Sequence, residues 1–410
     1  MPIGFAKSIL ASSTTATVAN AFVDWDGSND FTLTRSGATD QWIGFAPFNS
    51  EYGVLVHAVD SSQDVIMYDV IRNNSGTLSI TSQQNTLTTT SSSDYTDFGL
   101  VAPTQDGSVI YDGVSVGTSK YKRFTISGST VSVADGVTSG RSLYNRPLFV
   151  SRAGESNGYN NIRHGGTSQS EKVTTTDDFA SNESVTSETQ SNVSYFYGSG
   201  RFVPGFVDKD TVVALNSTDS GDTFQPYKID LTTTGSQTPG TFTGSPSSQD
   251  ITLYDSANST NFTSNVFDWT KFATPMFNDT AFNDTAFVIR REGGGSSNKY
   301  MIESYKANDA SFNRSNVITL TAGGSSDTSA TGCFVGANND VFLFANWHIT
   351  TSRIIVMKYV LSTNTLSEVL NFTITRHSDA AENAVVRLHR WGDDGALMTY
   401  NENKIRLIKP

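Results

Sequence analysis

The stretch that decides the fold reads Met67-Tyr68-Asp69-Val70-Ile71, then Asn73-Asn74-Ser75-Gly76, then Leu78-Ser79-Ile80. A strand with alternating apolar residues runs into a turn of Asn, Ser and Gly, and a second short strand follows. Alternation with a period of two buries one face of a strand, and these turn residues satisfy their own backbone groups. The stretch therefore predicts a β-hairpin.

Four further copies of this unit can be read along the chain, beginning at Tyr121, Tyr227, Met301 and Val356. The equivalent positions Val70, Phe124, Leu231, Tyr305 and Tyr359 are spaced by 54, 107, 74 and 54 residues. The step of 107 leaves room for a degraded unit between residues 145 and 190, where Pro147-Leu148-Phe149-Val150 has the composition of a strand. Repeats of this order with four strands each are typical of β-propellers. The sequence predicts an all-β propeller.

The two ends of the chain supply incomplete units. The last unit has only three strands, at 385–388, 395–398 and 404–408, whereas the N-terminal segments 21–25 and 31–34 have strand patterns but no unit of their own. Pairing these segments completes a blade and removes the exposed edges that an open ring leaves. We expect seven four-stranded blades, with six or eight as alternatives, closed by pairing of the N- and C-terminal strands. A chain of 410 residues also has room for two sandwiches.

Short apolar runs precede the units and are expected to be the innermost strands, because strands covered on both faces contain few polar residues. The turns Asp106-Gly107 and Asp394-Gly395 are expected to join inner strands to second strands as tight hairpins. The four runs are Gly53-Val54-Leu55-Val56, Phe98-Gly99-Leu100-Val101, Phe202-Val203-Pro204-Gly205-Phe206 and Gly332-Cys333-Phe334-Val335.

Charge and composition exclude several classes of protein. The formal net charge is -12, and no run of basic residues occurs, so neither nucleic acid nor an anionic membrane is an expected partner. Cys333 is the only cysteine, which excludes an intrachain disulfide and predicts a small buried core residue. No stretch approaches the roughly 18 apolar residues of a membrane span. Lys7 interrupts the apolar run from Ile3 to Leu10, so we expect no signal peptide.

Residues 1–20 differ from the rest of the chain, because they show neither strand alternation nor a pattern of charge. They are interpreted as an N-terminal arm that docks on a neighbouring subunit or as a disordered tail. Residues 21–410 are interpreted as the propeller.

One local motif supports this fold class. Ser217-Thr218-Asp219-Ser220-Gly221-Asp222-Thr223-Phe224 follows a strand and resembles the Asp box of sialidase-like propellers. The resemblance implies a turn between two outer strands, fastened by Asp219, with a special backbone angle at Gly221 and Phe224 packed between blades. Ser217 and Thr223 complete the motif. Because the box is a structural fastener in that family, it favours the fold and not sialidase activity.

The candidates for chemistry are few. Asp24, Asp26 and Asp30 surround a glycine turn loosely like a calcium loop, but a hairpin turn also accounts for them. Glycoside hydrolysis needs facing carboxylates, and the expected inner strands contain none; Glu51, Asp94 and Asp97 only precede them. We therefore expect no catalytic residues, no enzyme activity and no cofactor, with calcium as the alternative.

The opening Met1-Pro2-Ile3-Gly4-Phe5-Ala6-Lys7-Ser8-Ile9-Leu10 and the Ser/Thr/Asn-rich body that follows are similar in style to virion proteins of tailed phages. That resemblance implies a tail-associated or capsid-surface component. Such a protein would be made in the host cytoplasm and reside in the virion. It would bind other virion proteins through its N-terminal arm and could contribute to host attachment. The alternatives are a carbohydrate-binding adhesin, with Tyr195, Tyr197 and Trp347 as glycan contacts, and a sialidase-like glycosidase.

Overall fold

The computed structural model describes about half of the chain and shows an all-β protein. No helix occurs among the described residues, which are 31–33, 41–59, 65–89, 100–104, 106–112, 120–138, 148–151, 159–164, 169–174, 179–181, 184–189, 202–203, 205–206, 211–217, 224–230, 240–241, 253–255, 260–262, 270–271, 285–291, 299–306, 312–320, 327–335, 340–348, 352–374, 386–391, 395–400 and 403–408.

Within these residues seven sheets have four strands each, and five of them keep their strands in chain order from edge to edge. The first comprises β2 (Gln41–Pro47), β3 (Tyr52–Val59), β4 (Val65–Asn74) and β5 (Thr77–Thr89). The second comprises β6 (Leu100–Pro103), β7 (Val109–Asp112), β8 (Lys120–Ser127) and β9 (Thr130–Thr138). The third comprises β10 (Leu148–Ser151), β11 (Tyr159–His164), β12 (Gln169–Thr174) and β13 (Ser184–Thr189). The fourth comprises β15 (Gly205–Phe206), β16 (Thr211–Ser217), β17 (Phe224–Asp230) and β18 (Gly240–Thr241), and the sixth β26 (Asp327–Val335), β27 (Val341–His348), β28 (Arg353–Val360) and β29 (Thr365–Thr373).

The fifth and seventh sheets depart from this simple order. In the fifth, β23 (Lys299–Lys306) pairs with β22 (Thr285–Arg291) on one side and with two short strands, β24 (Phe312–Arg314) and β25 (Ile318–Thr319), on the other. The seventh has the order β1-β32-β31-β30, with β1 (Phe31–Thr32), β30 (Val386–Arg390), β31 (Ala396–Tyr400) and β32 (Lys404–Ile408). Two small pairs complete the description: β14 (Phe202–Val203) with β21 (Thr270–Lys271), and β19 (Leu253–Asp255) with β20 (Thr260–Phe262).

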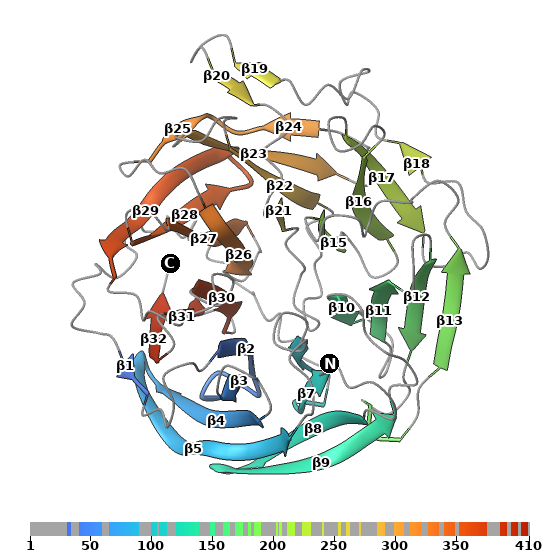
Figure 1. The fold of residues 1–410 in the computed structure, drawn as a ribbon, viewed down its shortest axis with the longest axis vertical. Coiled ribbons are helices and arrows are strands. Elements are labelled where there is room, and N and C mark those ends of the chain that lie inside the picture. Colours follow the sequence, from blue (N-terminus) through green and yellow to red (C-terminus); the bar gives the residue numbers. More distant parts are fainter. Residues whose placement is uncertain are drawn as a thin grey trace, which may run out of the picture.

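The seven sheets lie around a common centre in chain order (Figure 1). Strands β2, β10, β15, β26 and β30 lie nearest the centre, and β5, β9, β13 and β29 lie on the outside. The ends of the chain meet in the seventh sheet, where Phe31 is the register partner of Ile405 and Thr32 that of Lys404. Leu33 also donates its N–H to the Asn403 carbonyl oxygen at 2.7 Å. The outermost strand of this sheet therefore comes from the opposite end of the sequence to its other three strands.

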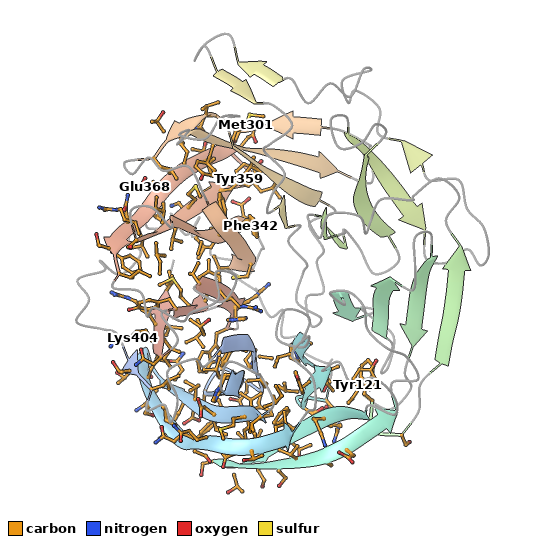
Figure 2. All side chains as sticks on the ribbon, viewed as in Figure 1. Tyr121, Met301, Phe342, Tyr359, Glu368 and Lys404 are labelled. Carbon is orange, nitrogen blue, oxygen red and sulfur yellow. The ribbon has the colours of Figure 1, made fainter. Side chains whose placement is uncertain are left out.

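Apolar side chains fill the boundaries between neighbouring sheets. Phe342, Phe344 and Tyr359 of the sixth sheet pack against Tyr300 and Ile302 of the fifth (Figure 2). The same sixth sheet buries its other face against the seventh, the seventh packs on the first, and the first packs on the second. The strands of the sixth, seventh and first sheets are buried on both faces, because each of these sheets is covered by two neighbours. Five successive sheets thus share one continuous series of cores.

Several sequence predictions are confirmed. The stretch that decides the fold forms the hairpin β4–β5, and the degraded unit forms the complete third sheet, from β10 to β13. One prediction is wrong. Gly53-Val54-Leu55-Val56 belongs to β3, the second strand, because the innermost position is taken by β2. The Met301 unit forms β23, which pairs with β24 as a hairpin, but it is the second strand of its sheet, whereas the equivalent units form third strands.

Candidate functional site

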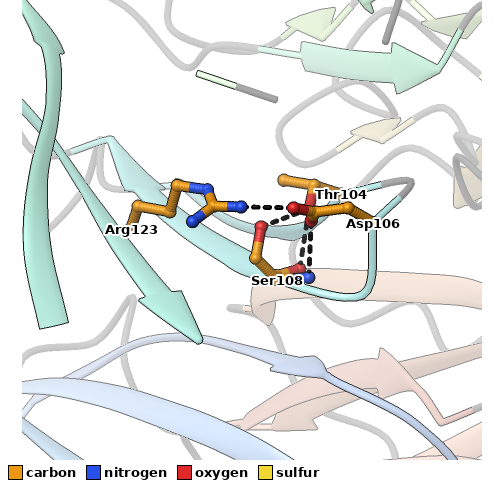
Figure 3. Close-up of polar contacts among 4 residues, drawn as sticks. All are labelled: Thr104, Asp106, Ser108 and Arg123. Carbon is orange, nitrogen blue, oxygen red and sulfur yellow. Dashed lines mark hydrogen bonds and ion pairs between the residues drawn. The ribbon is translucent and has the colours of Figure 1, made fainter. Parts of the chain in front are cut away.

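A cluster of polar side chains lies in the turn between β6 and β7 (Figure 3). The N–H of Thr104 donates to the carbonyl oxygen of Ser108 at 2.8 Å, and Gly107 has a φ of 80°, a left-handed value that suits glycine. The Asp106 Oδ1 accepts hydrogen bonds from the Thr104 hydroxyl at 2.6 Å and from the Ser108 N–H at 2.9 Å. Its other oxygen, Oδ2, binds the Arg123 guanidinium of β8. The expected hairpin between inner and second strands is confirmed, with a five-residue loop.

Asp106 is held in its charged form by this cluster. Although burial by itself raises the pKa of Asp106, hydrogen bonds from Ser108 and Thr104 and the nearby charge of Arg123 together place it below its ordinary value. A depressed carboxyl pKa stabilises the fold at any pH above the unfolded-state value and is lost as the pH falls through the folded-state value.

We expect Asp106→Asn to lower the free energy of unfolding at neutral pH by about 1 kcal/mol, because it weakens these contacts. Denaturant titrations of the wild type and the variant at a series of pH values test the assignment. As the pH falls below about 3.9, the ordinary value for Asp, the wild type should lose stability more steeply, and the two curves should converge. Parallel curves would show that Asp106 contributes nothing to the acid sensitivity.

Equivalent turns of the first and sixth sheets use acidic residues in the same way. Glu51, between β2 and β3, binds Arg72 of β4 with Oε1 2.5 Å from Nη2. Asp340, directly before β27, accepts hydrogen bonds from the Ser362 N–H at 2.8 Å and from the Ser362 hydroxyl at 2.7 Å. In each sheet a carboxylate from the first turn fastens the third strand or the turn that follows it. Each of these acidic residues therefore stabilises the sheet to which it belongs.

A buried pair of polar side chains lies in the first sheet. His57 of β3 and Asp69 of β4 are 0% and 1% exposed, and His57 Nε2 lies 3.4 Å from Asp69 Oδ2. Asp69 Oδ1 also accepts the Gln84 N–H at 2.7 Å, where the β4–β5 ladder shifts register and Gln84 has a φ of 53°. Asp69 thus supports an irregular point of the ladder. Sequence reasoning missed this pair, although a histidine within the apolar run Gly53–Val59 was a usable signal.

The boundary between the seventh and first sheets, which we call the closing seam, has an aromatic anchor. Trp391 follows β30, is 1% exposed, and donates its indole N–H to the Asn49 carbonyl oxygen at 2.9 Å. Its ring centroid lies 4.8 Å from that of Phe45 on β2. Buried tryptophan stabilises most when its N–H has a partner, as here. The seam therefore joins residues that are 342 positions apart in the sequence.

Most candidate site residues lie outside the described residues. This holds for Asp24, Asp26 and Asp30, for Tyr195 and Tyr197, and for Asp219, Gly221 and Thr223 of the Asp box. Ser217 and Phe224 are register partners, so the box occupies the hairpin between β16 and β17. These are the second and third strands of the fourth sheet, whereas the resemblance implies two outer strands. Trp347 lies in β27 opposite Ile354.

Of the carboxylates considered for glycoside hydrolysis, Asp94 and Asp97 lie outside the described residues. Glu51 is bound to Arg72. Among the described residues no group of three or more His, Cys, Asp or Glu side chains could hold a metal ion. In the same part of the chain, no helix is long and apolar enough to cross a membrane.

Cys333 is the buried core residue that its sequence context predicts. It is 9% exposed in the core between the sixth and seventh sheets, and burial raises the pKa of its thiol to about 12, against a smaller opposing effect of Arg390. We expect a disulfide reagent at pH 8 to leave the native protein unlabelled and to modify one thiol per chain after denaturation, because the thiolate is the reactive form. Rapid stoichiometric labelling of native protein would contradict this placement.

Comparisons with known proteins find solved structures that resemble this chain but do not assign it to a family. No protein-family model matches the chain, and no curated protein matches it. It is similar to a solved hydrazine synthase structure from Kuenenia stuttgartiensis, with a TM-score of 0.48, 9% identity, and coverage of 89% of this chain and 95% of that one. A protein from Lactobacillus plantarum gives a TM-score of 0.46 at 9% identity, covering 88% and 97%. A putative 6-phosphogluconolactonase from Bacteroides fragilis gives 0.41 at 11% identity, covering 82% and 85%.

Proposed function

We propose that the seven four-stranded sheets are the blades of one closed β-propeller, and that this ring is a structural component of a phage particle, tail-associated or on the capsid surface. The observation that carries the proposal is that the two ends of the chain are joined. β1 pairs with β32 inside the seventh sheet, and Trp391 binds the first sheet across the closing seam. Closure of this kind leaves no open edge between first and last blades.

The use of charged side chains supports a scaffold role. Asp106, Glu51 and Asp340 each bind a group of their own sheet, and Asp69 supports a register shift in the β4–β5 ladder. A carboxylate engaged in this way is positioned by the fold and supports its rigidity. The similarity in style of the first ten residues to virion proteins of tailed phages directs the proposal to a particle, and we propose that the N-terminal arm makes the contacts with other virion proteins.

Particle fractionation tests this function. Antibodies against the recombinant chain would be applied to particles banded in a density gradient from cultures that produce it, and immunogold labelling would locate it. We expect the chain to band with filled particles and to remain after a high-salt wash. A nonsense mutation in its gene, with and without a suppressor, is the matched control and should give particles that lack the labelled feature.

Two results would contradict the proposal. One is a chain that stays in the soluble fraction while particles band without it. The other is normal particles from the nonsense mutant. A glycan array with the purified chain separates the adhesin alternative, because specific binding by a chain absent from particles would favour that class. A panel of chromogenic glycosides tests the glycosidase alternative, because hydrolysis by the purified chain would favour that class.

A further inference from the structure

A side chain from the fifth sheet covers part of the outer edge of the sixth sheet. β29 pairs with β28 on one side, and no described strand pairs with its other side. At Leu366 a side-chain amide occupies that free side: Asn316 Oδ1 accepts the Leu366 N–H at 2.8 Å, and Asn316 Nδ2 donates to the Leu366 carbonyl oxygen at 3.0 Å. A neighbouring antiparallel strand supplies the same two bonds to a residue. The Asn316 amide therefore takes the place of a peptide group.

Asn316 is fixed in this position by the fifth sheet. The preceding residue, Ser315, donates its N–H to the Ile302 carbonyl oxygen at 2.9 Å, and its hydroxyl accepts the Ile302 N–H at 2.9 Å. Two residues further on, Ile318 pairs with Tyr300 in the β25–β23 ladder. The amide is thus held on one sheet and presented to the edge of the next, while Asn316 itself remains exposed at the surface.

The edge of β29 has few of the usual defences against strand pairing. Lysine, proline and inward-pointing charges normally protect edge strands. β29 contains neither Lys nor Pro, and its only charged residue, Glu368, accepts a hydrogen bond from the Asn371 amide at 2.9 Å. One register shift, opposite Val356 and Met357, interrupts its ladder. A copy of the same edge is a suitable partner, since two identical strands can pair antiparallel about a two-fold axis.

Two other outer edges in the described part of the chain, those of β5 and β9, are protected by other means. The β4–β5 ladder has three register shifts, which twist an edge away from regular pairing. On β9, the turn that contains Phe179 lies against Gly136. The β28–β29 ladder has a single register shift. The Asn316 amide is therefore the main protection that we identify for the edge of β29.

We propose that Asn316 is an edge guard, and that the edge of β29 which it closes is a latent pairing surface for a second copy of this chain. The guard keeps the Leu366 peptide groups satisfied within one molecule. Removing it exposes a free donor and acceptor near the start of a polar, nearly uncharged edge. The inference concerns association of the chain with itself and holds whether or not the chain belongs to a particle.

Sedimentation velocity over a range of protein concentrations tests the guard. We expect Asn316→Ala to form a species of twice the wild-type mass as the concentration rises. Asn371→Ala is the matched control, because it truncates an asparagine of β29 whose amide binds side chains and not the edge backbone. That control should keep the wild-type mass at every concentration.

A rescue variant distinguishes guarding from a merely structural role. Thr365 is exposed at the start of β29, and a lysine there supplies the missing edge charge without restoring either bond to Leu366. Asn316→Ala combined with Thr365→Lys should return to the wild-type mass. The proposal is overturned if folded Asn316→Ala keeps the wild-type mass, or if the added lysine leaves the association unchanged. Should Asn316→Ala fail to fold, Asn316→Ser takes its place, and failure of both would make Asn316 a packing residue and overturn the proposal equally.

Discussion

Trp391→Ala is expected to lower the free energy of unfolding by about 3–5 kcal/mol, the usual cost of deleting a buried aromatic side chain. The indole is 1% exposed, packs at a tilt against Phe45 with ring centroids 4.8 Å apart, and donates its N–H to the Asn49 carbonyl oxygen. The truncation removes all three contributions at the closing seam. It should therefore weaken the seam that joins the two ends of the chain before it affects the remote third sheet.

Equilibrium unfolding in urea gives the size of this effect, and amide hydrogen exchange gives its location. Trp391→Phe keeps a ring beside Phe45 but lacks the N–H, so it should lose a smaller part of the stability, about 1–2 kcal/mol. Exchange in Trp391→Ala should accelerate first in β1 and β32. A loss below 1 kcal/mol, or equal losses for both variants, would show that the indole does not anchor the seam.

Gly136→Ala is expected to have the second large effect. A Cβ built on Gly136 would lie 2.5 Å from the carbonyl oxygen of Phe179 and 3.2 Å from that of Tyr121. Both atoms belong to backbone, so neither can swing aside. The turn that contains Phe179 must move, although the Phe179 ring is fully buried with its centroid 4.8 Å from that of Tyr121. We expect a loss of about 2–4 kcal/mol, since the strain costs 1–3 kcal/mol and the ring loses part of its burial.

A double-mutant cycle checks this explanation. Phe179→Ala alone should cost about 3–5 kcal/mol. The double variant with Gly136→Ala should cost clearly less than the sum, because once the Phe179 ring is gone, displacement of its turn no longer costs any ring burial. Ser132→Ala, at an exposed position of the same strand, is the control and should stay within about 0.5 kcal/mol of the wild type. Additive losses would mean that Gly136→Ala does not disturb the packing of the Phe179 ring.

The local part of the fold could be predicted from the sequence because its signals are local. The hairpin β4–β5 follows from alternating apolar residues around Asn73-Asn74-Ser75-Gly76. The order of strands within a sheet was harder to predict. β2 and β3 are both apolar because both are covered on two faces, so periodicity does not tell which is innermost. In the fifth sheet β24 and β25 share one side of β23, and no repeat pattern in the sequence marks that division.

The polar contacts were largely beyond prediction because their partners are distant in sequence. Trp391 and Asn49 are 342 positions apart, and Asn316 and Leu366 are 50 apart. Asp69 occupies a polar position of an alternating strand, where exposure is the ordinary expectation, yet it is 1% exposed because β4 is covered on both faces. Only the turn at Asp106-Gly107 was predictable, since its residues define it locally.

The most direct test of the account is a disulfide between the two ends of the chain. Thr32 and Lys404 are register partners at the surface, and paired residues of neighbouring strands lie within the Cα separation of about 4.4–6.8 Å that a disulfide needs. Because Cys333 is buried, the double variant Thr32→Cys with Lys404→Cys should form one crosslink under mild oxidation of native protein. The bond should also raise the midpoint of unfolding, whereas Thr32→Cys with Thr130→Cys, which joins β1 to the distant strand β9, should not crosslink. Failure of the first pair to crosslink in native protein would contradict a ring closed by its own termini.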